Sequence, residues 1–437
     1  MIPITTIAKE DIGEFDVETK FIPMLRSIFI CAVLLGAVWG WSADRLDQRH
    51  WYLVAHDPLR DFDATAWSYL SLQQALGFGD QSLTAQNSIN SHWYTRTGNL
   101  LGMAYLNLAI GYYAHEIGHD ITGPHFGDGR QWLTWPSGMP WPTYHRSRVY
   151  NVCGSWCQDF ERWDRALDYS GLNMEAYASD LMAFHTHDTL SWDEGMAYLF
   201  RRLSPVTYDL YSPDGFKLKK ENGHWKFELA NDIGDPAQYL GAERAAGNKI
   251  SYGDFYLRCL VPQLLTFRVY ESFATGLKYW HDGTMSRVPW SWHVQGLELQ
   301  PPIVTDYVLR NGTLWDSHFL WRREGQRSWH RLTLGMDADW IGHGSLQRWH
   351  FAMENPWFTW NTPWRNVVRT SLEQSFNWER APLNYLGCEL SAKAQVGLWR
   401  SLALDMTVAY SHEDLLAQEV RLEDNGLRWT VGLQGEY

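Results

Sequence analysis

The sequence predicts an α+β protein whose first half is helical and whose second half is an antiparallel β domain. Apolar residues recur every three or four positions across residues 44–204, and apolar and polar residues alternate along several runs after residue 205. A period near 3.6 is typical of a helix packed on one face, and a period of two is typical of a strand with one apolar face. Asn-Gly pairs, which favour tight hairpin turns, stand inside two of the alternating segments.

Residues 1–43 have the features of an export leader. After Ser27 every residue is apolar or glycine as far as Trp41, a length that suits a secretory signal better than a membrane-spanning helix. Acidic residues before Met24 are unusual in a signal peptide, so we expect translation to begin at Met24 and cleavage to fall near Ala43. An uncleaved anchor is the alternative. Both interpretations place the bulk of the chain outside the cytoplasm.

Composition limits the class of partner. The net charge of −13 argues against nucleic acid, because phosphate binding requires a basic surface. The 26 tryptophans and 15% aromatic residues favour a membrane interface, although carbohydrate binding or a large core would also use them. The cysteine content fits an oxidising compartment, where Cys153 and Cys157 are close enough in sequence to form a disulfide.

In the first half, the run "NLLGMAYLNLAIGYYAHEIGHD" predicts a long apolar helix that carries a metal motif near its end. His115 and His119 are four residues apart and therefore share one helix face. Their imidazoles can bind one zinc ion, and Glu116 can face a water bound to it, as in the H-E-x-x-H pattern of zinc hydrolases. The alternative is a buried helix whose histidines make only local hydrogen bonds.

A hydrolytic zinc site has three protein ligands and keeps a fourth position for water. One candidate for the third ligand is His125, near the spacing at which metzincin proteases place their third histidine. In those enzymes a glycine stands where this chain has Thr122, and the nearest glycine here is Gly123.

The second candidate is Glu175, in the run "SGLNMEAYASDLM". This run resembles the one in gluzincin (thermolysin-like) metallopeptidases, with one extra residue between Asn173 and Glu175 and another between Glu175 and Asp180. The resemblance implies a helical, zincin-like domain in which Glu175 joins the two histidines as the third ligand of Zn²⁺. Asp180 as the ligand itself is a lesser alternative.

If zinc is bound, the expected reaction is hydrolysis of a peptide or protein substrate, although another amide or an ester is also compatible. Glu116 would act as general base towards the attacking water and then pass the proton to the leaving amine. His185 and His187, in "FHTHD", are the candidates for stabilising the oxyanion.

Residues 205–437 read as a β domain of about 10–12 strands, including a hairpin at 215–229. The strands of about ten residues, the tight turns and the terminal Tyr437 resemble bacterial outer-membrane β-barrels. The resemblance implies a transmembrane barrel in contact with outer-membrane lipid, and a soluble β-sandwich is the alternative. The predicted lipid-facing side chains are Leu402, Leu404, Val408, Trp429, Val431 and Leu433, and the predicted lumen-facing ones are Asp405, Arg428 and Gln434. The segment 254–283 fits either a buried helix or two strands.

Three functional hypotheses follow. The first is an exported, membrane-associated zinc metallopeptidase with its helical domain attached to the barrel. The second is an outer-membrane channel or assembly component whose helical plug holds a structural metal. The third is an intramembrane protease, indicated by the apolar run before His115.

Overall fold

The computed structural model describes the helices and strands named below together with short adjoining segments. The described residues are 50–54, 66, 69–70, 72–77, 92–125, 131–134, 143–146, 160–211, 217–221, 224–228, 252–309, 312–325, 329–338, 348–354, 358–361, 367–379, 385–399, 402–412, 416, 420 and 426–436. The predicted leader, the cysteine pair at 153 and 157, and Tyr437 lie outside them.

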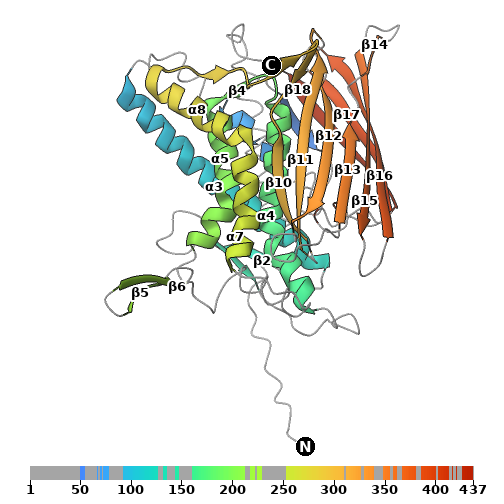
Figure 1. The fold of residues 1–437 in the computed structure, drawn as a ribbon. Coiled ribbons are helices and arrows are strands. Elements are labelled where there is room, and N and C mark those ends of the chain that lie inside the picture. Colours follow the sequence, from blue (N-terminus) through green and yellow to red (C-terminus); the bar gives the residue numbers. More distant parts are fainter. Residues whose placement is uncertain are drawn as a thin grey trace, which may run out of the picture. The chain divides into compact units, whose positions relative to one another are not determined.

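Helices dominate the first half of the described chain (Figure 1). The long helices are α3 (Trp93–His125), α4 (Phe160–His185) and α5 (Trp192–Tyr211). The segment that fitted either a helix or two strands forms two helices, α7 (Tyr252–Leu265) and α8 (Phe267–Asp282). Among the described residues, no helix combines the length and apolarity required to cross a bilayer.

The second half forms one large antiparallel sheet of twelve strands, to which the first half contributes one strand. Its order is β1-β18-β17-β16-β15-β13-β12-β11-β9-β8, with β10 also paired to β11 and β14 to β15. The strands are β1 (His50–Val54), β8 (Trp292–Val294), β9 (Leu297–Leu299), β10 (Ile303–Leu309), β11 (Gly312–Arg323), β12 (His330–Asp337), β13 (Arg348–Glu354), β14 (Phe358–Asn361), β15 (Val367–Glu379), β16 (Tyr385–Trp399), β17 (Leu402–His412) and β18 (Gly426–Glu436). The prediction of a helical region followed by an antiparallel β region is therefore confirmed.

Hydrogen bonds between the described strands do not close this sheet into a barrel. The sheet begins at β1 and ends at β8 and β10, and these edges are not paired with each other. The predicted hairpin at 215–229 forms, as β5 (Lys217–Glu221) and β6 (His224–Glu228), but it is a separate two-stranded sheet. Two further small sheets pair β2 (Gln131–Thr134) with β3 (Thr143–Arg146) and β4 (Leu190–Ser191) with β7 (Ser286–Arg287).

The edge strand β10 is capped by side chains from the helices. The amide of Asn173, on α4, donates to Val308 O at 2.8 Å and accepts from Val308 N at 2.9 Å. The hydroxyl of Thr266, between α7 and α8, bonds in the same way to the backbone N and O of Val304, at 2.9 and 2.8 Å. Buried backbone groups need such partners, and here helices supply what a further strand would otherwise provide.

The two faces of the sheet have opposite character. One face carries buried polar side chains, among them Asp316, His318, Thr333, His350, Ser375, Asn377, Glu389, Ser391 and Ser411. The other carries exposed apolar side chains, among them Leu334, Trp349, Phe351, Leu372, Phe376, Leu386, Leu390, Met406, Val408, Tyr410, Leu427 and Trp429. The strand register places Val408 opposite Trp429 and Met406 opposite Val431 on the apolar face. This polarity is the inverse of that in a water-soluble sheet, whose apolar face is buried.

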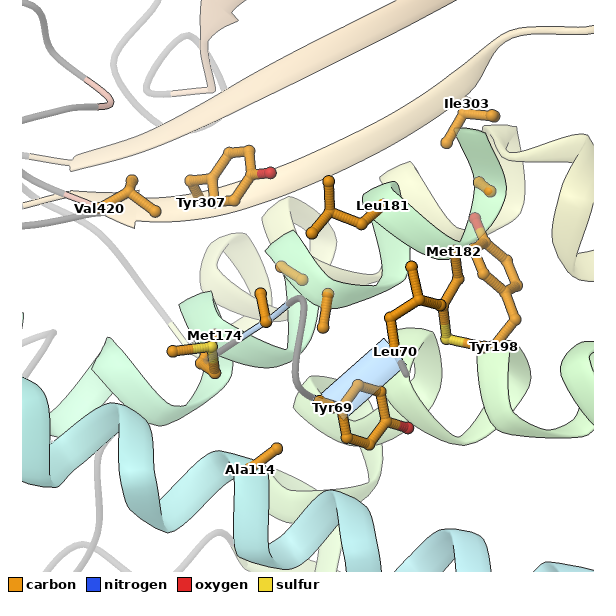
Figure 2. Close-up of a cluster of buried hydrophobic side chains, with 14 of the residues drawn as sticks. Tyr69, Leu70, Ala114, Met174, Leu181, Met182, Tyr198, Ile303, Tyr307 and Val420 are labelled. Atoms are coloured by element: carbon orange, nitrogen blue, oxygen red, sulfur yellow. The ribbon is translucent and has the colours of Figure 1, made fainter. Parts of the chain in front are cut away.

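Helix α4 packs on the polar face of the sheet beside β10, and a cluster of buried apolar side chains lies on both sides of this helix. In Figure 2, Ile303 and Tyr307 extend from the strand towards Leu181 of α4, while Met174 lies further along the same helix. Polar contacts lie within this packing. Asp180 of α4 accepts hydrogen bonds from the hydroxyls of Thr305 and Tyr307, the latter at 2.7 Å. The interior is therefore held by hydrogen bonds and ion pairs as well as by apolar contact.

Candidate metal site between helices α3 and α4

The predicted metal ligands His115 and Glu175 lie together where α3 packs against α4. His115 Nδ1 is 3.7 Å from Glu175 Oε1, and both side chains are buried. The close approach of the helices depends on Gly171 of α4, where an added Cβ would lie 2.6 Å from His115 Nε2. A larger residue at 171 would therefore push the imidazole away from its present position.

The separation of these two groups suits a shared zinc ion. Zinc lies about 2.1 Å from nitrogen and oxygen ligands, so two ligand atoms of a tetrahedral site are about 3.4 Å apart. The 3.7 Å between His115 Nδ1 and Glu175 Oε1 is close to that value. Glu175 Oε2 is buried without a hydrogen-bond partner among the described residues, which leaves a second oxygen for an ion. The donor types and their spacing therefore fit the metal that the sequence implies.

A third group, Arg201 of α5, also binds Glu175. Arg201 Nη1 is 2.6 Å from Glu175 Oε1, and Arg201 Nη2 donates to the backbone oxygen of Asn107, on α3, at 2.8 Å. One guanidinium thus links all three helices. Sequence reasoning missed Arg201, although a charged Arg201–Arg202 pair directly after the apolar stretch 196–200 was an available signal.

The electrostatics of Glu175 result from two opposing effects. Burial raises the pKa of its carboxyl from 4.5 to about 7, and the nearby polar groups, namely the positive charge of Arg201 and a hydrogen bond with Ser204, oppose this rise. The carboxyl therefore changes its protonation state near neutral pH. A metal ligand must be deprotonated, so cation binding here would displace a proton at slightly acid pH.

The remaining members of the H-E-x-x-H motif lie on the same helix. Glu116 and His119 are within α3, and helical periodicity places His119 one turn after His115 on the same face. Their side chains lie outside the described part of the structure. Among the side chains that are described, no group of three or more His, Cys, Asp or Glu is arranged to hold a metal.

The two alternative third ligands, His125 and Asp180, have less support from the structure. Helix α3 continues to His125, so the backbone does not turn back after His119 as the metzincin arrangement requires. Asp180 is directed to the sheet, where His318 Nε2 is 3.2 Å from its Oδ2. Of the two candidates whose side chains are described, Glu175 is near His115 and Asp180 contacts the sheet instead.

The two histidines predicted to stabilise an oxyanion are not near this site. His185 is ten residues after Glu175 on α4, which corresponds to about 15 Å along the helix axis. His187 lies beyond the helix end, where its ring packs on Trp329 and its Nε2 is 3.3 Å from Asp188 Oδ2. The site at Glu175 therefore has Arg201, rather than these histidines, as its nearby polar group.

Comparison with protein-family models, with curated proteins and with solved structures finds no match. The functional interpretation therefore depends on the residues themselves.

Proposed function

We propose that this chain is a membrane-associated, zinc-dependent hydrolase that cleaves peptide bonds, with its metal site between α3 and α4. The observation that carries the proposal is the 3.7 Å approach of His115 and Glu175, which stand sixty residues apart in sequence and on different helices. His115, His119 and Glu175 would hold the ion. These are the ligand types of a catalytic zinc site with two histidines and one glutamate.

Each residue has a defined part in the proposed chemistry. Bound zinc would lower the pKa of a water molecule to about 7 and polarise the substrate carbonyl. The Glu116 carboxylate would take the proton of the attacking water and deliver it to the leaving nitrogen. Arg201 positions the Glu175 carboxylate through its 2.6 Å bond and favours the ionised form that a ligand must have.

The proposed location is the outer membrane, with the apolar face of the sheet in contact with lipid. The alternation of exposed Leu, Phe, Trp and Val with buried Ser, Asn, His and Glu supports this location. Charged groups cluster on the inner face: Arg331 is 3.0 Å from Glu354 and 2.5 Å from Glu373, and Lys393 is 2.8 Å from Glu373. Transmembrane barrels have an apolar exterior and a polar interior of this kind. Side chains from the helices bond to the backbone of β10, so β10 does not need to pair with β1 to satisfy these groups.

Metal content and hydrolysis of a fluorescent denatured-protein substrate, measured on the purified full chain, test this proposal. We expect about one zinc per chain in the parent protein, and loss of zinc in His115→Ala and Glu175→Ala. Glu116→Gln should retain zinc and lose hydrolysis. Glu324→Ala, which changes an exposed glutamate paired with His293, is the matched control and should change neither. A correctly folded parent protein that binds no zinc would disprove the proposal.

A second candidate function is an outer-membrane channel or assembly component in which the helices form a plug. The observation that favours it is the Arg201–Glu175 ion pair, which links the helices without any metal. Under this hypothesis Arg201→Gln would disrupt the helical packing, and Glu116→Gln would have no effect on function. Ion conductance across planar bilayers that persists in Glu116→Gln would favour this alternative.

A further inference from the structure

Helix α8 has the same inverted polarity as the sheet. Its buried positions are polar, and they include Arg268, Glu271, Ser272 and Thr275. Most of its exposed positions before the last turn are large and apolar, and they include Tyr270, Phe273, Leu277 and Trp280, with Lys278 as the charged exception. Arg268 Nη1 lies 3.3 Å from Glu271 Oε2 inside the molecule, while Phe273 is 59% exposed. A helix on a water-soluble surface has the opposite arrangement.

Helices α7 and α3 repeat this pattern. On α7, Arg258 and Gln263 are buried, and Leu257, Leu260, Leu264 and Leu265 are exposed. On α3, Arg96, Asn107 and His115 are buried, and Leu101, Tyr105, Leu106 and Leu108 are exposed. Residues 97–114 of α3 include no charged side chain.

The three helices are contiguous with one another and with the edge of the sheet. Arg96 of α3 donates to the backbone oxygens of Trp280 and His281 at the end of α8, both at 2.7 Å. Trp315 of β11 donates to the backbone oxygen of Arg258 of α7 at 2.9 Å, and Thr266 caps β10. Helix α7 therefore lies against β10, and α8 and α3 follow it at this edge of the sheet (Figure 1).

We infer that the exposed faces of α3, α7 and α8 contact the hydrocarbon of the same bilayer as the sheet, so that the lipid-facing surface is part strand and part helix. This inference rests on the membrane location proposed above. Three observations support lipid as the occupant: each helix buries an arginine together with other polar side chains, most of its large exposed side chains are apolar, and the helices lie at the edge of the sheet. The aromatic cluster of Phe267, Tyr270, Trp290 and Trp292 at the start of α8 is of the type found at membrane–water interfaces.

Spin labels on the full chain in lipid vesicles test the inference directly. The five native cysteines are first replaced by serine, and this parent must still insert. Labels are then attached to Leu101→Cys and Phe273→Cys on the helices, to Val408→Cys on the sheet and to Asp282→Cys as the exposed polar control at the end of α8. Collision rates with oxygen, which partitions into lipid, are compared with those of a water-soluble nickel chelate.

The expected result is that the helix labels and the sheet label collide severalfold more with oxygen than with the nickel chelate, and that the label at 282 shows the reverse. If the label at 408 contacts lipid while those at 101 and 273 contact water, the inference is wrong and the membrane location stands. If the label at 408 also contacts water, the proposed location itself fails. Dipolar broadening between labels at 273 that disappears on dilution with unlabelled chain would identify a second copy as the occupant and overturn the inference.

Discussion

Replacing Val408 with arginine places a charge on the face of the sheet that we assign to lipid. Strand β17 has 11 residues, which extend about 36 Å, or about 27 Å along the membrane normal at a tilt of about 40°. Val408 is six residues from the strand start, or about 15 Å along that normal, and so lies within a few ångströms of the midplane. An arginine at the midplane of a barrel costs about 2–4 kcal/mol, which lowers the folding equilibrium constant by about 30- to 700-fold.

The assay is urea-dependent folding of the full chain into lipid vesicles, followed by gel mobility without heating. Thr430→Arg is the matched control, because the alternation of apolar and polar residues in the sequence predicts that Thr430, which follows Trp429, lies on the opposite face. We expect Val408→Arg to shift the urea midpoint strongly and Thr430→Arg to shift it little. Equal shifts for the two variants, or folding of Val408→Arg in buffer without vesicles, would refute the assignment of this face to lipid.

Four further predictions follow from individual residues. The pKa of Glu175 is about 7 in the folded protein, whereas an exposed glutamate has a pKa of 4.5. Its contribution to the stability of the metal-free protein therefore declines as the pH rises from 4.5 to about 7, and Glu175→Gln should remove that slope in urea titrations. For the same reason, the zinc affinity measured by calorimetry should fall about tenfold per pH unit below 7, beyond the contribution of the histidines. Gly335→Ala should lower the free energy of unfolding by about 1–3 kcal/mol, because the added Cβ would lie 2.2 Å from Asp316 Oδ1 and 2.6 Å from His350 Cβ. Denaturant unfolding measures this loss, and an unchanged midpoint would contradict the close packing at this position. Asn173→Ala should cost about 2 kcal/mol by leaving two backbone groups of β10 unpaired, and hydrogen exchange in β10 should accelerate.

Much of the fold is evident in the sequence where one periodicity continues over a whole element. Alternation of side chains predicts β17 and β18, because each strand has one apolar and one polar face. The order of the strands in the sheet is harder to predict from the sequence, since β1 pairs with β18, which lies nearly four hundred residues away. The segment that forms α7 and α8 was ambiguous because Pro262 interrupts a run that is apolar enough for a buried helix but also fits two strands.

The candidate site was predictable in part for a similar reason. The i, i+4 spacing of His115 and His119 is local, and the carboxylate of Glu175 was recognisable from the sequence around it. The contact of Arg201 with Glu175 depends on how α5 packs against α4, which no local pattern specifies. The assignment of His185 and His187 to the site came from their position in sequence, and the helical rise between Glu175 and His185 separates them from it.

The capping of β10 by Asn173 and Thr266 determines how many strands the sheet can have. An edge strand with free backbone groups can accept another strand, either from the same chain or from a neighbouring molecule. Here the backbone groups of Val304 and Val308 are already bonded to side chains, so the sheet cannot grow at this position. In closed barrels the strand number is set by the first strand meeting the last, whereas in this protein two polar side chains on the helical layer end the sheet at β10.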